Sequence, residues 1–269
     1  MLIDTHLHLD AAEFDADRAA VLERALRAGV SGFVVPAVDR AGFERVLRLA
    51  EAMPDVFPAL GIHPLQTDAA SEADLVALDN LLGQGKCVAV GEIGLDHYAP
   101  GGNAARQQAF FIAQLELARL HELPVILHLR KAQDAALAAL RRIKVPGGVV
   151  HAFNGSFQQA RAFIAQGFKL GFGGAMTFLG SRRIRQLAGG LPLEAIVLET
   201  DAPDMPPAWG LGRRNEPENL RRYAETLAGL RGLALDAVIE ASGANAVDIF
   251  GLEKGNEMGC QNGGISFYR

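Results

Sequence analysis

The stretch LIDTHLH, residues 2–8, begins with a short apolar run and ends on two histidines. The run from Leu2 to His6 predicts a β-strand, and strand pleating sends side chains two positions apart to the same face. His6 and His8 are therefore expected to point the same way, with the spacing of a pair of metal ligands. Alone, the pair is equally compatible with hydrogen-bonded surface residues. The prediction of the fold and of a site depends on whether an apolar run followed by polar groups recurs along the chain.

The pattern recurs along the chain, with segments of helical periodicity between the apolar runs. The strand candidates are Leu2–His6, Gly32–Pro36, Val56–Ile62, Cys87–Gly91, Val125–His128, Gly148–Ala152, Phe168–Phe172 and Ile196–Thr200. Several lack any apolar–polar alternation, as strands buried on both faces should. This order predicts βα units and a parallel sheet. Because no Gly-x-Gly-x-x-Gly turn follows a strand, we expect an α/β fold of the closed (β/α)8 TIM-barrel type rather than an open sheet.

Two helices are predicted with particular clarity, over Asp15–Ala28 and Asn103–His121, from apolar residues at helical spacing. No linker rich in Pro or Ser interrupts the chain, so residues 1–252 are expected to form a single barrel domain. Residues 253–269 are rich in Gly and Asn and have few apolar anchors. We expect them to form a flexible C-terminal tail.

Composition excludes several classes of protein. The chain has 269 residues, 49% hydrophobic and 21% charged, which indicates a compact fold rather than a disordered chain. Its net charge of −5 gives no overall field that attracts nucleic acid, so any such contact must be local. Cys87 and Cys260 form neither a disulfide framework nor a thiolate zinc cluster. We expect a cytoplasmic protein with no signal peptide and no membrane span.

Polar side chains stand at the ends of five of the apolar runs. They are His6, His8, Glu92, His128, His151 and Asp201. In a barrel these ends meet on one rim, where active sites lie. Burying such groups without partners costs several kcal/mol each, so we expect divalent cations among them, although separate hydrogen bonds are the alternative.

The six groups offer enough donors for two ions. The expected arrangement places His6, His8 and Asp201 on one ion, His128 and His151 on the other, and Glu92 between them. Imidazole-rich ligands suit Zn, Mn, Fe or Ni better than Mg.

The motifs DTHLHLD, GIHP, GEIGLD, ILHLRKA, VHAFNGS, LETDAPDMP, RRNEPENL and ANAVDIFG resemble, in order, those of the TatD family of metal-dependent hydrolases. The DMP segment is similar to that of the YjjV-like branch. The resemblance implies a TIM barrel, the same six metal ligands, two divalent ions such as Mg, Mn or Zn, and hydrolysis of phosphodiesters, chiefly trimming of 3′ DNA ends. It also implies a second possible activity, because some members act on mis-acylated tRNA.

Three positions depart from the family pattern. His97 replaces a Tyr or Phe, Leu129 replaces a Ser, and Asp204-Met205 replaces an aromatic-Leu pair. These departures bear on the substrate more than on the metal ligands.

Further residues are candidates for contacts around the metal site. The resemblance gives His63 a substrate-contacting role, and Arg130 and Arg214 are candidates for bidentate bonds to phosphate oxygens. Glu199 shares pleat phase with Asp201 and is a candidate for holding a ligand in place. The glycines of residues 171–175 suit either the approach of a phosphate or a tight turn.

Three hypotheses follow. In the first, the protein is a phosphodiesterase acting on a single-stranded DNA end, in which two ions activate water and Asp201 and Glu92 are catalytic, with Asp201 as general base. In the second, the same site hydrolyses an amide, a lactone or an aminoacyl ester. In the third, the protein binds without turnover and the metal site is vestigial. We expect a monomer or weak oligomer in each case.

Overall fold

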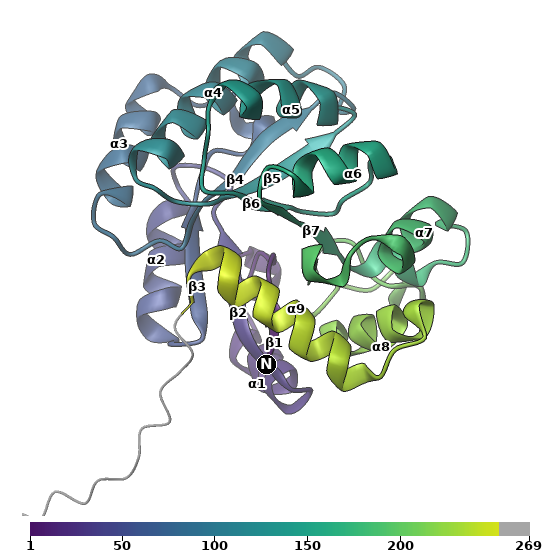
Figure 1. The fold of residues 1–269 in the computed structure, drawn as a ribbon. Helices are drawn as coiled ribbons and strands as arrows, with labels where there is room; N and C mark the ends of the chain where they lie inside the picture. Colours follow the sequence, from purple (N-terminus) through teal and green to yellow (C-terminus); the bar gives the residue numbers. More distant parts are fainter. Residues whose placement is uncertain (253–269) are drawn as a thin grey trace, which may run out of the picture.

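The computed structural model describes residues 1–252, which form one parallel sheet of eight strands in the order β1 to β8 (Figure 1). The strands are β1 (Leu2–Asp4), β2 (Val30–Pro36), β3 (Val56–Leu60), β4 (Ala89–Asp96), β5 (Val125–Arg130), β6 (Gly148–Val150), β7 (Phe168–Phe172) and β8 (Ile196–Leu198). Thr5 N donates to Leu198 O at 3.1 Å, which links the end of β1 to β8. The predicted (β/α)8 TIM barrel is confirmed.

Every strand lies in or overlaps a predicted apolar run, but the ends differ. β1 stops at Asp4, so His6 and His8 follow the strand rather than close it. β4 continues to Asp96, which corrects the expectation that it ends at Gly91 before Glu92. All residues of β4 are buried, and the pairing of β4 with β5 is irregular between Val90 and Ile93. Glu92 is therefore a polar residue inside a strand.

Helices follow the strands around the outside of the barrel. They are α1 (Arg18–Arg27), α2 (Phe43–Ala52), α3 (Glu72–Leu82), α4 (Ala104–Leu120), α5 (Gln133–Arg142), α6 (Phe157–Ile164), α7 (Arg182–Gly190), α8 (Leu220–Arg231) and α9 (Leu235–Phe250). α4 matches its prediction because Asn103 caps it, with Oδ1 accepting from Arg106 N at 3.1 Å. α1 begins later than predicted, after a 3-10 turn at Ala12–Phe14. None of these helices has the length and apolar character to cross a bilayer.

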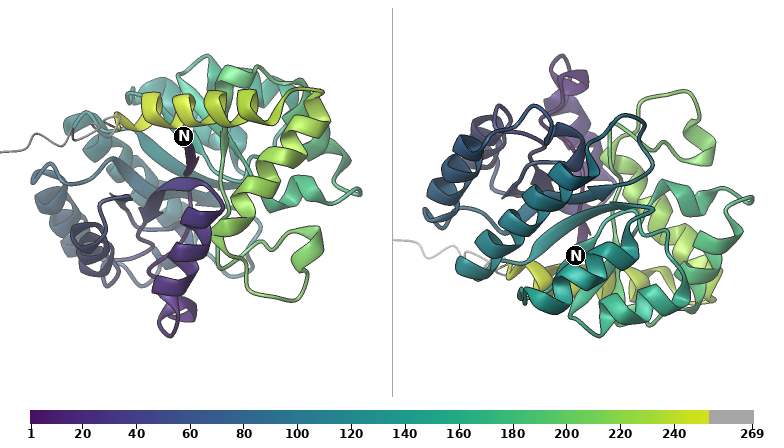
Figure 2. Two further views of the ribbon diagram at one scale, coloured as in Figure 1. Left: turned by 90° about the horizontal axis from the view of Figure 1, so that it is seen from below. Right: turned by 90° about the horizontal axis from the view of Figure 1, so that it is seen from above.

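Helix α9 lies across one end of the barrel and covers the amino ends of the strands (Figures 1 and 2). Its Ala246 and Phe250 pack with a buried cluster of strand residues that includes Ile3 and Val34. Asn245 Nδ2 donates to the carbonyls of Leu193 and Ile196. With this end filled, the carboxyl ends of the strands are left to carry a site.

Two further expectations concern the C-terminal segment and the two cysteines. The flexible tail predicted for 253–269, and Cys260 within it, lie outside the described residues. Cys87 is buried as predicted, and burial raises the pKa of its thiol to about 12.

Candidate metal centre

The carboxyl ends of the strands bring the six predicted ligands together. His6 Nε2 and His8 Nε2 each lie 3.5 Å from Asp201 Oδ1. The same two nitrogens lie 3.3 Å and 3.7 Å from Glu92 Oε2. The two histidines after β1 therefore lie close both to Asp201, after β8, and to one oxygen of Glu92 in β4.

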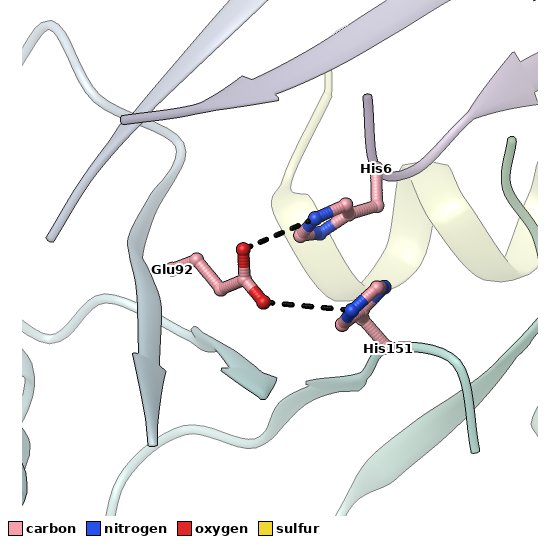
Figure 3. Close-up of side chains that lie close together, drawn as sticks. All are labelled: His6, Glu92 and His151. Atoms are coloured by element: carbon pink, nitrogen blue, oxygen red, sulfur yellow. Dashed lines mark ion pairs between the residues drawn. The ribbon is translucent and has the colours of Figure 1, made fainter. Parts of the chain in front are cut away.

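The second oxygen of Glu92 faces another set of rings. Oε1 lies 2.9 Å from His128 Nδ1, 3.5 Å from His151 Nε2 and 3.7 Å from His63 Nε2. Figure 3 shows the carboxylate between His6 and His151, with one oxygen directed to each ring. Glu92 thus has the position of a bridge between two groups of donors.

The donor set fits a divalent cation. His6 and Glu92 are buried, and neither ring nitrogen of His6 has a hydrogen-bond partner. The rings of His6 and His151 stack with centroids 3.9 Å apart. Unpartnered buried imidazoles are costly, and a cation between them would use their lone pairs.

Three groups of donor atoms each lie within 4.8 Å of one another and could hold an ion. They are His6, Glu92 and His151; His6, His8 and Asp201; and His63, Glu92 and His128. The first group shares His6 with the second and Glu92 with the third, so the candidate sites are adjacent, and Glu92 is a carboxylate common to two of them.

The electrostatics of the cluster keep its acids ionised. Burial alone would raise the pKa of Glu92, but His6, His63 and His151 hold it well below the usual value. Burial opposes ionisation of Asp201 too, and His151 and His8 nevertheless lower its pKa. Both carboxylates are therefore available as anionic ligands at neutral pH.

Two further carboxylates face the outer nitrogens of the imidazoles. Glu199 Oε1 lies 3.3 Å from His151 Nδ1 and accepts from Ala152 N at 2.5 Å. Asp96 Oδ2 lies 3.2 Å from His128 Nε2. Such partners fix the orientation and tautomer of a ligating histidine.

Glu199 was predicted from its pleat phase, but Asp96 was missed. The signal for Asp96 lies in the segment GEIGLD, because a strand that runs on past Glu92 gives both acids the same pleat phase.

Gly171 near the end of β7 and Gly173 just after it make room for Glu199. A Cβ at Gly171 would lie 2.1 Å from Glu199 Oε2, and one at Gly173 would lie 2.4 Å from Glu199 O. These two glycines therefore allow close packing against the residue that follows β8.

A cavity of about 890 Å³ opens beside the cluster and is lined by His128, His151 and Asp201. Arg130 also lines it, with Nη1 3.3 Å from Asp96 Oδ2. Leu129, Asp204 and Met205, at two of the positions that depart from the family pattern, line the cavity as well. His97, at the third, is exposed and is not among the residues that line it.

Arg214 lies elsewhere. Its guanidinium pairs with Asp17 at 2.9 Å and 2.8 Å and with Glu216 at 2.7 Å, and it stacks over Phe14. These three contacts with carboxylates occupy the guanidinium N–H groups that were predicted to bind a phosphate. A contact between Arg214 and substrate stays a prediction, and this geometry does not favour it.

Comparison with known proteins agrees with this geometry. Residues 3–251 match the family described as TatD related DNase. The chain is 41% identical over 251 residues to the Escherichia coli K12 protein named as uncharacterized metal-dependent hydrolase YjjV, covering 92% of this chain and 97% of the relative. The crystal structure of that TatD homologue superposes with a TM-score of 0.91, covering 94% of this chain and 98% of the other.

A second relative, the Bacillus subtilis protein named as uncharacterized metal-dependent hydrolase YabD, is 32% identical over 252 residues, covering 93% of this chain and 99% of the relative. A match over almost the whole chain, together with the clustered ligands, confirms the resemblance seen in the motifs. The chain belongs to the TatD family of metal-dependent hydrolases.

Proposed function

We propose that the protein is a metal-dependent phosphodiesterase that removes nucleotides from the 3′ end of single-stranded DNA. One observation carries the proposal: the two oxygens of Glu92 face two separate groups of imidazoles beside a cavity that also presents Arg130. The name of the matching family, TatD related DNase, supports a nucleic-acid substrate. A cytoplasmic location for the protein, and a monomeric or weakly oligomeric state, remain predictions.

The histidines proposed to bind cations each lie close to Glu92 or Asp201. In this proposal His6, His8 and Asp201 would hold one ion, His128 and His151 would hold a second, and Glu92 would be shared. Divalent ions bound there supply Lewis-acid chemistry, activating water and neutralising charge on phosphoryl oxygens. Mg, Mn and Zn are the candidate ions, and the imidazole content favours Mn or Zn.

Asp201 is the proposed general base. Its Oδ1 lies at the junction of the two β1-loop histidines, and the neighbouring rings keep its carboxylate ionised. An ionised carboxylate at this position can accept the proton of the attacking water. Glu92 assists because its two oxygens face both groups of proposed ligands and keep them close together.

His63 and Arg130 are the proposed contacts to the scissile phosphate. His63 Nδ1 accepts from Leu65 N at 3.1 Å, so the neutral ring carries its proton on Nε2, which faces Glu92. Burial lowers the pKa of His63 to about 4, which keeps the ring neutral and makes Nε2 a hydrogen-bond donor. Arg130 presents a planar guanidinium suited to phosphate oxygens.

The test is cleavage of a 3′-labelled oligonucleotide in the presence of Mg, Mn or Zn. Asp201→Asn and His128→Ala should each lower kcat by at least about 100-fold, as loss of a general base or metal ligand does. His121→Ala is the matched control, because His121 pairs with Asp79 away from the cluster and should keep full activity.

Parallel assays with a D-aminoacyl-tRNA and a small lactone identify the bond that is cleaved. Turnover of either carbonyl substrate with no cleavage of the oligonucleotide would overturn the proposal. Elemental analysis should find two ions per chain, and Glu92→Gln should lose both because it faces both groups.

A further inference from the structure

The cavity beside the metal centre is larger than a scissile group requires. Its volume of about 890 Å³ lies near the upper end of the range of roughly 300–1,000 Å³ that holds drug-sized ligands. The metal ligands line only one part of it. The remainder is formed by the end of β5, by the loops after β4, β5, β6 and β8, and by the first turns of α5, α6 and α7.

This remainder is basic in an acidic protein. Arg130 ends β5, Lys131 follows it, and Arg183 stands at the start of α7. Apart from the ligand Asp201, the acid among the lining residues is Asp204. Since the chain has a net charge of −5, this concentration of cations is local, which is the condition for recognising an anion here.

Contacts within the protein hold these cations in place. Arg183 Nη2 donates to Asn154 Oδ1 at 2.6 Å, which ties α7 to the loop after β6. Lys131 Nζ lies 4.6 Å from the centre of the Tyr98 ring, and the Arg130 guanidinium lies 4.4 Å from it. Cations supported in this way lose less conformational freedom when an anion binds.

The backbone gives an independent sign of a ligand site. Among the described residues, five other than glycine have positive φ, and four of them line this cavity: Lys131, Ala152, Asp201 and Met205. Lys131 has a φ of 54°. Left-handed backbone is unfavourable for such residues and gathers at ligand sites, where the side chain must point in a required direction.

We propose that Lys131 and Arg183 bind the phosphate adjacent to the scissile one, so that the preferred substrate is a strand carrying at least two phosphates. The inference rests on the proposed phosphodiesterase activity and narrows its substrate class. Arg130 and His63 remain assigned to the scissile phosphate. Asn154, which also lines the cavity, offers a neutral donor to the same anion through its amide nitrogen.

The test pairs a protein change with a substrate change. The substrates are two short oligonucleotides, one natural and one with an uncharged methylphosphonate next to the scissile bond. With the parent protein, kcat/KM should be about 10-fold lower for the methylphosphonate, the effect of losing one charge-assisted contact. Lys131→Gln and Arg183→Gln should lower kcat/KM about 10-fold for the natural strand and by much less for the methylphosphonate.

The controls separate charge from folding and position. Arg142→Gln removes an exposed arginine at the end of α5, outside the cavity, and should match the parent on both substrates. Lys131→Arg and Arg183→Lys keep the charge and should restore most of the preference for the natural strand. An equal loss on both substrates for the glutamine variants would overturn the inference.

Binding to the metal-loaded protein keeps this inference distinct from the proposed activity. By fluorescence anisotropy, the parent should bind the natural strand about 10-fold more tightly than the methylphosphonate, and the glutamine variants should bind the two alike. Failure to cleave any phosphodiester would overturn the proposed function and leave this binding difference to be measured. Equal binding of both strands by the parent would overturn the inference even if cleavage occurs.

Discussion

Asp96 Oδ2 lies 3.2 Å from His128 Nε2, while Nδ1 of the same ring faces Glu92. Asp96 Oδ1 accepts from the backbone N–H groups of Tyr98 and Ala99, both at 2.9 Å, which fixes the carboxylate. Asp96 Oδ2 also lies 3.3 Å from Arg130 Nη1. One buried acid therefore orients a proposed metal ligand and an arginine that lines the cavity.

Replacing Asp96 by Asn should weaken metal binding. Each carboxylate oxygen of Asp96 faces two donors, whereas an amide has a single acceptor oxygen. In the variant, one of the two pairs of donors would therefore meet an NH2 group. Loss of such an outer partner typically costs 10- to 100-fold in metal affinity, and we expect a loss in that range. Titration of the metal-free protein with Mn2+ or Zn2+ measures it.

The matched control for this prediction is Asp79→Asn. Asp79 Oδ1 lies 2.7 Å from His121 Nε2, the same kind of pair outside the metal centre. This variant should bind metal like the parent. Equal affinity of Asp96→Asn and the parent would contradict the role assigned to Asp96.

Sequence reasoning predicted the barrel because buried strands and amphipathic helices have distinct local patterns. β7 was placed correctly at Phe168–Phe172, where glycines stand on either side of the apolar run. β4 was cut short because a polar residue normally marks the end of a buried run, and Glu92 lies inside the strand. The error hid Asp96, which lies further along the same strand.

The clustering of the six proposed metal ligands was predictable because each follows or interrupts an apolar run whose end must reach the barrel rim. Arg214 had no comparable signal. Its main partner, Asp17, is 197 positions away, and nothing local in the sequence indicates that these residues meet. Contacts between loops of distant βα units form only in the assembled barrel. The sequence alone therefore could not show which loop arginines contact substrate and which stabilise the fold.

Adding a methyl group at Gly171 should displace Glu199. The new Cβ would lie 2.1 Å from Glu199 Oε2 and 2.5 Å from its Cδ, and Glu199 is buried. Overpacking of this kind costs about 1–3 kcal/mol, so we expect Gly171→Ala to lower the free energy of unfolding by that amount and to weaken metal binding through His151. Urea denaturation and metal titration measure the two effects.

Gly229→Ala is the comparison for this change. Gly229 lies inside α8, and a Cβ there would have no neighbour within 4 Å. Replacing a helical glycine by alanine should raise the free energy of unfolding by about 0.5–1 kcal/mol. A Gly171→Ala protein as stable as the parent would show that β8 can move away from β7.

Asp4 should make the protein less stable as pH rises. It is fully buried, and although Thr200 donates to both of its oxygens, burial raises its pKa to about 8 from the ordinary 3.8. Between about pH 4 and pH 8 the unfolded chain ionises at this position while the folded chain stays protonated. The free energy of unfolding therefore falls across that window as pH rises.

Asp4→Asn should remove this slope. Relative to the parent, the variant should gain stability between pH 4 and pH 8 by an amount on the order of a few kcal/mol. Urea denaturation at pH steps in the presence of a chelator measures the difference, with the exposed Asp55→Asn as control. Parallel curves for the parent and Asp4→Asn would contradict the raised pKa.

Arg214 tests whether an arginine of the family motif serves structure or substrate. Its side chain is about one-quarter exposed and pairs with Asp17 and Glu216, joining the loop after β8 to the start of α1. Arg214→Gln would leave these acids with Arg24, which is 2.6 Å from Glu216 and 3.7 Å from Asp17. We expect a loss of about 1–2 kcal/mol in the free energy of unfolding, since partial exposure limits the value of the pairs.

The kinetic readout separates the two roles. If Arg214 acts through these ion pairs, kcat/KM of Arg214→Gln for an oligonucleotide should stay within about twofold of the parent under conditions where both are folded. Arg213→Gln, at the exposed neighbouring position, should change neither stability nor turnover. Unchanged stability with a loss of tenfold or more in kcat/KM would instead place Arg214 on the substrate, because a charge-assisted bond to phosphate is worth about that factor.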